Sequence, residues 1–189
     1  LSLGHAGFMS VGAFAGVVVT TSLTDAIPFA PLRLAIAMVV GGLLAAIAGV
    51  IVGVPVLRLK GDYLAIVTLA FGEIIKNIVN VLYIGRDADG LHVSLLQQNF
   101  ELGDGGKMVI NGPMGVTGVM KISTFTIGFV LILITLFLVL NFMHSRTGRA
   151  VMALRDNAIA AESTGIPITH YKLLAFVISA AFAGMAGTL

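Results

Sequence analysis

The sequence contains no cysteine, and only 11% of its 189 residues are charged. The absence of cysteine excludes disulfide bonds, thiolate metal sites and cysteine nucleophiles. A soluble domain carries roughly 25% charged residues. This chain has 58% hydrophobic residues and a mean hydropathy of +1.04, so it has too few polar side chains to cover a surface in water. The composition therefore indicates an integral membrane protein.

Motifs that mark enzymes are also missing from the sequence. A phosphate-binding loop is excluded, because Glu101 stands where its first glycine is required and Met108 follows the Gly106-Lys107 pair. There is no H-E-x-x-H or G-x-S-x-G motif, and the four histidines are widely scattered, at His5, His92, His144 and His170. We therefore expect a protein that is not an enzyme and that has no cofactor and no metal site.

Five apolar segments are long enough to cross a membrane, since a bilayer core of about 30 Å requires about 20 helical residues. They cover residues 2–23, 32–57, 62–83, 123–143 and 171–189. Alternating patterns of about ten residues, as in barrel strands, are absent. The sequence predicts an all-α polytopic membrane protein, with a bundle of about five transmembrane helices in a single domain over residues 1–189. Because residue 1 is leucine rather than methionine and residue 189 falls inside an apolar run, we expect this domain to be part of a longer protein.

The positions of the basic residues predict an orientation, because cytoplasmic loops carry more lysine and arginine than external ones. With residues 144–172 placed inside, the inner side holds Arg58, Lys60, Arg146, Arg149, Arg155 and Lys172. The outer side then holds Arg33, Arg86, Lys107 and Lys121. We expect a cytoplasmic loop at 144–170 and an extracytoplasmic loop at 84–122. Since these basic residues lie mostly at the edges of apolar runs, the net charge of +2 does not indicate a nucleic-acid partner.

The first span is unusually rich in small residues, with Gly4, Gly7, Gly12 and Gly16 close to His5. Glycine is roughly 1 kcal/mol less favourable than alanine inside a helix. Two interpretations stay open: a discontinuous helix that lines a solvated path, or an intact helix whose glycines allow dense packing.

The third span carries a polar stripe where lipid would disfavour it. Glu73, Lys76, Asn77 and Asn80 follow i, i+3, i+4 and i+7 spacing, so they share one helix face. An ionised side chain at the membrane centre costs at least about 2.5–3.5 kcal/mol, so Glu73 should face the bundle and pair, with Lys76 as the candidate. The stripe either lines a translocation route or locks two helices together. The candidate route residues are Ser2, Gly4, His5, Gly7, Glu73, Asn77 and Asn80.

A compact polar insert, "RTGRAVMALRDNAIAAESTGIPITHYK", separates the last two spans. Residues 155–164 favour a short helix, with Asn157 as a turn or cap signal and Gly165 at its end. Such a helix either docks into a groove of another protein or forms part of an ordered loop.

Several stretches together resemble one family. The "ALRDNAIAAESTGI" and "YKLLAFVISAAFAGMAG" stretches are similar to the coupling-loop region of permease subunits of bacterial ABC importers. The "LSLGHAGFMSVGAF", "GDYLAIVTLAFGEIIKNI" and "NGPMGVTG" stretches resemble the branched-chain amino-acid permeases of that class, in the family's order.

The resemblance implies a multi-pass permease of the bacterial inner membrane, which translocates leucine, isoleucine or valine delivered by a periplasmic amino-acid-binding protein. It also implies a second related permease and two cytoplasmic ABC ATPase subunits as partners. The ATPase-coupling residues implied by the resemblance are Arg155, Asp156, Asn157, Ala160, Ala161, Glu162 and Gly165.

One stretch departs from the family's pattern, since residues 87–109 are longer than its usual approach to "NGPMGVTG". Two other classes remain open from the residues alone. One is a secondary amino-acid transporter in which Glu73 carries a coupling proton, and the other is a non-transporting membrane scaffold.

Overall fold

The described part of the chain is mostly helical. In the computed structural model it comprises residues 4–24, 27–57, 59, 62–87, 90–95, 107–116 and 124–189. Its elements up to residue 95 are α1 (His5–Ser22), α2 (Ala30–Val56), α3 (Asp62–Asn80), β1 (Leu82–Asp87) and β2 (Gly90–Leu95). Those that follow are β3 (Lys107–Asn111), the 3-10 helix η1 (Gly112–Met114), α4 (Phe125–His144), α5 (Arg146–Asp156), α6 (Ala158–Ser163) and α7 (Ile168–Gly187).

Within the described residues, four helices are long and apolar enough to cross a membrane, namely α1, α2, α4 and α7. They match four of the five predicted spans, and their ends differ from the prediction by no more than three residues. The third predicted span forms α3, which carries the polar stripe and ends at Asn80 because the chain enters β1 at Leu82. The prediction of a polytopic helical membrane protein is therefore confirmed.

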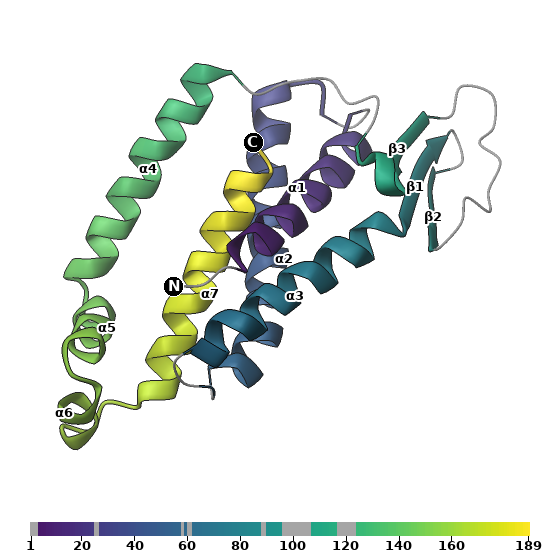
Figure 1. Ribbon diagram of the computed structural model, residues 1–189. Helices are drawn as coiled ribbons and strands as arrows, with labels where there is room; N and C mark the ends of the chain where they lie inside the picture. The colour runs from purple at the N-terminus through teal and green to yellow at the C-terminus, as the bar shows by residue number, and fades with distance from the viewer. Residues whose placement is uncertain are drawn as a thin grey trace.

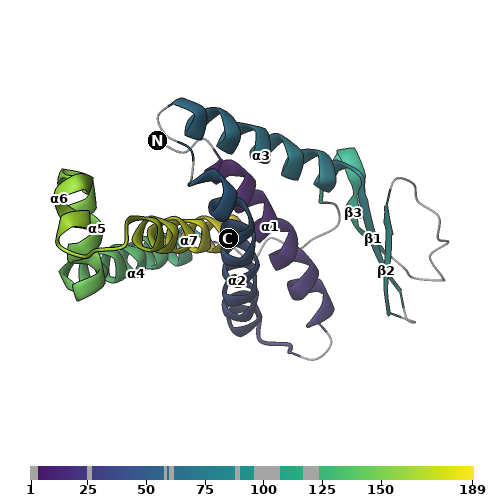
Figure 2. The same ribbon diagram turned by 90° about the horizontal axis from the view of Figure 1, so that it is seen from below.

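Helices α1, α2 and α7 pack together as the centre of the bundle, as Figures 1 and 2 show. Their core contains Phe8, whose side chain is 2% exposed, together with small or branched residues of α2 and α7. The ring of Phe8 meets that of Phe176 edge to face, with centroids 5.5 Å apart. This contact joins α1 to α7, and its edge-to-face geometry is one that aromatic pairs prefer.

Glycines bring the three central helices into close contact. A Cβ atom added to Gly12 of α1 would overlap the backbone of Gly184 in α7, and one added to Gly184 would overlap the side chain of Ala45 in α2. Such small residues allow helix backbones to approach closely in a membrane. Of the two interpretations of the first span, the structure shows the second, because α1 is an unbroken helix from His5 to Ser22.

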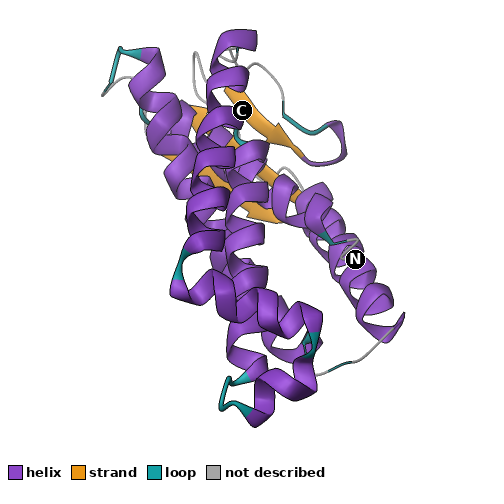
Figure 3. Ribbon diagram, turned by 90° about the vertical axis from the view of Figure 1, so that its left-hand side faces the viewer, coloured by secondary structure: helices purple, strands orange, loops and turns teal. Residues whose placement is uncertain are grey.

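The predicted extracytoplasmic loop contains a small antiparallel sheet that the sequence did not predict. The strand order is β2-β1-β3, with an irregular register between Ile84 and Gly85. Ile84, Val109 and Ile110 are buried against the second half of α1, where Val17 and Val18 lie. Arg86 also donates a hydrogen bond to the carbonyl oxygen of Thr21. These contacts fix the sheet to the end of α1. The strands, orange in Figure 3, lie far from α5 and α6, which are at the opposite end of the molecule in Figure 1.

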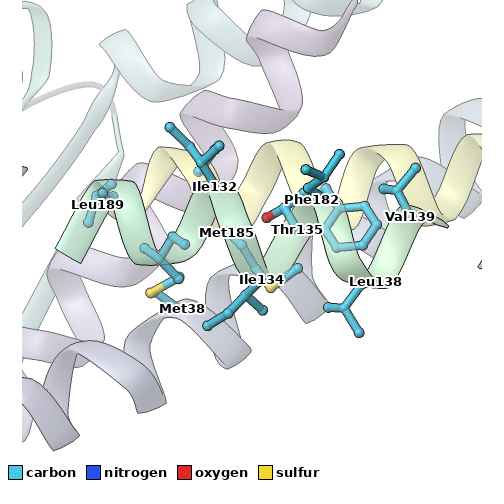
Figure 4. A pocket seen from close by; sticks show the side chains of 13 residues that line it. Met38, Ile132, Ile134, Thr135, Leu138, Val139, Phe182, Met185 and Leu189 are labelled. Atoms are coloured by element: carbon cyan, nitrogen blue, oxygen red, sulfur yellow. The ribbon is translucent and has the colours of Figure 1, made fainter. Parts of the chain in front are cut away.

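Helix α4 stands apart from the central bundle at the left of Figure 1, whereas α3 lies on the right of the bundle. It has no buried residue. An apolar groove of about 560 Å³ separates it from α2 and α7, and Figure 4 shows Met38, Thr135 and Met185 among the side chains that line it. In a bilayer, such a helix is stabilised by lipid tails or by neighbouring membrane helices rather than by this part of the chain alone.

Candidate functional site

The corner between α4 and α5 is held by its own hydrogen bonds. The hydroxyl of Ser145 accepts a bond from the Gly148 amide at 3.0 Å and donates one to the Phe142 carbonyl at 2.6 Å. The guanidinium of Arg149 donates to the carbonyl of His144 at 2.8 Å. Ser145 therefore caps α5 at its N-terminus, and the start of α5 is fastened to the end of α4.

Asn157 divides the predicted coupling helix into two. Its φ of −155° is extended, so α5 ends at Asp156 and α6 begins at Ala158. The side-chain oxygen of Asn157 accepts hydrogen bonds from the amides of Ile159 and Ala160, both at 3.1 Å. The cap predicted at Asn157 is confirmed. A single helix over 155–164 is wrong, because capping of α6 requires backbone outside the helical region at Asn157.

Gly165 ends the α6 turn, as the sequence predicts. Its φ of +85° lies in the left-handed region that side chains disfavour. The amide of Gly165 donates to the carbonyl of Glu162 at 2.9 Å, and the amide of Ile166 donates to the carbonyl of Ala161 at 3.2 Å. These bonds satisfy the last carbonyls of α6, and the chain then enters α7.

The exposed surface of α5 and α6 contains most of the predicted coupling residues. Exposed among them are Arg155, Asp156, Asn157, Ala160, Glu162 and Gly165. The guanidinium of Arg155 lies 3.0 Å from the carboxylate of Asp156. Ala161 differs, because its side chain is 5% exposed and packs within the chain, so it positions α6 and presents no contact surface. Ile159, which the sequence does not single out, is 81% exposed beside the coupling residues.

A second site lies where α1 crosses α3. Gly4 faces buried Thr68, whose carbonyl oxygen would be 2.8 Å from a Cβ on Gly4, and Gly7 faces Gly72. Beyond this contact the two helices enclose a crevice of about 360 Å³. We call it the α1–α3 crevice. Its lining residues are Ala6, Gly7, Ser10, Phe14, Leu69, Gly72, Glu73, Lys76, Val79 and Asn80.

Glu73 and Lys76 form an ion pair on the wall of this crevice. The ammonium of Lys76 lies 3.1 Å from the carboxylate of Glu73, and their side chains are 63% and 58% exposed, respectively. The predicted pairing is confirmed. The expectation that Glu73 is covered by the bundle is wrong for the described chain, because α3 packs on α1 through Gly72 and leaves the charged stripe beside that contact open.

The other candidate route residues lie in different surroundings. The imidazole Nε2 of His5 lies 2.6 Å from the hydroxyl oxygen of Ser179 in α7. Asn80 lines the crevice, whereas Asn77 is exposed and does not line it. Ser2 lies outside the described residues. Among those residues, no group of three or more His, Asp or Glu side chains comes together as a metal site.

Comparisons with known proteins place this sequence in a family. The whole chain, residues 1–189, matches the family of branched-chain amino acid transport system permease components. It is 36% identical over 199 residues to the high-affinity branched-chain amino acid transport system permease protein LivM of Salmonella typhimurium and to LivM of Escherichia coli. In both cases the match covers 100% of this chain and 45% of the relative.

A third relative is the L-arabinose ABC transporter permease protein AraH of Azospirillum brasilense, 30% identical over 183 residues, which are 95% of this chain and 46% of that protein. No solved structure matches the chain significantly. The chain thus spans about half the length of the curated relatives it matches. With its apolar helices and its match over the full length, the chain is a multi-pass membrane protein that belongs to the family of branched-chain amino acid transport system permease components.

Proposed function

We propose that the chain is part of a permease subunit of an ATP-driven importer in the bacterial inner membrane. The importer takes branched-chain amino acids from a periplasmic binding protein and moves them inward. A second related permease completes the membrane route, and two cytoplasmic ABC ATPase subunits hydrolyse ATP. The family and the two LivM relatives support this proposal, and they do not favour a proton-coupled secondary transporter or a scaffold.

The α5–α6 unit is the observation that carries the proposal. A six-residue helix with exposed Ile159 and Glu162 is capped at both ends and joined through fixed corners to the membrane helices α4 and α7. A force applied to α6 therefore reaches α7 through the turn at Gly165 and α4 through α5. Figure 1 shows the unit beyond the end of α4, separated from the sheet by the length of the bundle. This arrangement suits a docking element for a motor protein on one side of the membrane.

Branched-chain amino acids are the proposed cargo because both LivM relatives are more similar to this chain than the arabinose permease is, at 36% against 30% identity. The substrate is selected mainly by the binding protein, since a route that must release its cargo gains nothing from holding it tightly. The permease then needs only an opening on alternate sides of the membrane.

Reconstitution of the full-length protein tests the proposal. We expect the ATPase subunits to co-purify in mild detergent, and we expect proteoliposomes with these subunits and the binding protein to take up leucine only when ATP is present on the ATPase side. The exchange Glu162→Trp on α6 should abolish uptake, whereas Phe129→Trp, an exposed apolar position on α4, should not. Uptake driven by a proton gradient without ATP would contradict the proposal.

A further inference from the structure

We propose that the Glu73–Lys76 pair in the α1–α3 crevice is a binding site for zwitterionic amino acids in transit. The cargo inserts between the two side chains, so that Glu73 binds its ammonium group and Lys76 binds its carboxylate. This inference rests on the proposed function, because it names the groups that recognise the backbone of the transported amino acid.

The crevice has the lining that such a ligand requires. The two charges stand one helical turn apart on α3, and Lys76 already lies within 3.1 Å of Glu73. Apolar Phe14 of α1 and Leu69 of α3 line the same crevice, next to the charges. Small ligands are held by such a combination of apolar walls and a few placed polar groups. At about 360 Å³, the space is large enough for a free amino acid.

Charge balance explains why a zwitterion in particular should fit. The pair has no net charge, and a free α-amino acid has none either. Insertion replaces one ion pair by two, so neither the empty nor the loaded crevice leaves a charge unpaired. A solute with only one charge can pair with only one of the two side chains, so it forms one ion pair where a zwitterion forms two. The pair therefore discriminates against simple amines, carboxylates and ions.

The internal pair also keeps the binding weak. Ion pairs this exposed contribute little stability, so the Glu73–Lys76 bond opens readily when a zwitterion arrives. It reforms when the cargo leaves, and this competition favours release. The apolar side chain of the cargo contacts the apolar lining of the crevice, for example Leu69 one helical turn from Glu73, and such a surface accepts aliphatic groups without fixing their shape.

Two variants test the site in the complete importer, reconstituted with its ATPases and binding protein: in one both charges are neutralised, and in the other they are swapped. We expect Glu73→Gln with Lys76→Gln to lower leucine uptake at least tenfold, while ATPase activity stimulated by the binding protein stays within twofold of the unmodified importer. The swap Glu73→Lys with Lys76→Glu should restore at least a third of the uptake, because both charges remain. The exchange Ile74→Val, at an exposed position of α3 outside the crevice, is the control. Unchanged uptake in the doubly neutral protein would overturn the inference but not the proposed function, which fails only if the unmodified importer shows no ATP-driven uptake.

A labelling experiment tests the same site without altering either charge. A Ser10→Cys variant places a thiol in the crevice, in a chain that has no other cysteine. We expect leucine at tens of millimolar to slow the reaction of this thiol with a maleimide at least threefold. The related 4-methylpentanoate, which lacks the ammonium group, should have less than a third of this effect. Equal protection by both compounds, or protection by neither, would overturn the inference.

Discussion

The imidazole of His5 and the hydroxyl of Ser179 lie 2.6 Å apart between α1 and α7. Helix α7 begins just after α6, and α1 continues from His5 along the α1–α3 crevice through Gly7 and Ser10. The contact therefore connects the helix that follows the docking element to the helix that borders the proposed route. A movement of α7 is passed to α1 at this point as well as through their shared core.

Removal of this hydrogen bond should loosen α1 from α7. A Ser179→Ala exchange is expected to cost about 0.6–1.5 kcal/mol of stability, the range for polar bonds between membrane helices. The thermal unfolding midpoint of the purified protein should fall by a few degrees, and leucine uptake should fall with it. Ser22→Ala is the matched control, since within the described part of the chain the Ser22 hydroxyl donates to the Val18 carbonyl of its own helix. Equal effects of the two changes would show that the contact between the helices has no special role.

The contact between α2 and α7 does not tolerate a larger residue at Gly184. A Cβ at this position already overlaps the side chain of Ala45, so Gly184→Val should separate the helices and destabilise the protein by about 1–3 kcal/mol, as overpacking does. Thermal unfolding in detergent measures this loss. Gly128→Ala on α4 is the control, because its Cβ would meet only Leu189 at an ordinary 3.6 Å. A stable Gly184→Val protein would contradict the packing described for the bundle.

Loss of the Asn157 cap should unfold α6 while the bundle remains intact. Asn157→Ala removes the acceptor for the amides of Ile159 and Ala160, at a cost of about 0.5–2 kcal/mol. Hydrogen exchange at these two amides should accelerate, and ATP-driven uptake should decrease. Asn157→Asp keeps a capping oxygen and should preserve both properties. If hydrogen exchange at these amides and ATP-driven uptake are unchanged in Asn157→Ala, α6 does not depend on its cap.

Gly165 should act through its backbone conformation. Apart from its two chain neighbours, no atom of the described residues lies within 4 Å of a Cβ built on it, so its φ of +85° is what opposes a substitution there. Left-handed backbone costs an ordinary residue about 1–2 kcal/mol, and we expect Gly165→Val to raise the amount of ATP hydrolysed per leucine transported. Gly165→Asn should have a smaller effect, since asparagine tolerates this conformation. An equal effect of both variants would contradict a conformational cause.

The sequence predicted the membrane helices well because their signal is local. An apolar run of about 20 residues has few alternatives in lipid, and the four most apolar spans agree with the structure. The caps at Asn157 and Gly165 were also predictable, because the preferences of these residue types act over only a few neighbours.

Features that depend on distant contacts were not predictable in the same way. The strands around Ile84 and Val109 become a sheet only because their apolar faces pack on α1, and no short-range pattern shows that partner. The burial of Ala161 and the exposure of Ile159 depend on how α6 is placed relative to its neighbours. The pairing of Glu73 with Lys76 followed from spacing, but the crevice beside it depends on where α1 crosses α3.

The central claim is that α6 meets a motor on the cytoplasmic side while the sheet faces the opposite side. Single cysteines at Ile159 and Met114, which are 81% and 75% exposed, can be labelled without background from residues 1–189, which contain no cysteine. With a membrane-impermeant maleimide, Ile159→Cys should react only in inside-out vesicles and become protected when the ATPase subunits are added. Met114→Cys should react only in right-side-out vesicles. Labelling of both positions from the same side would contradict the account.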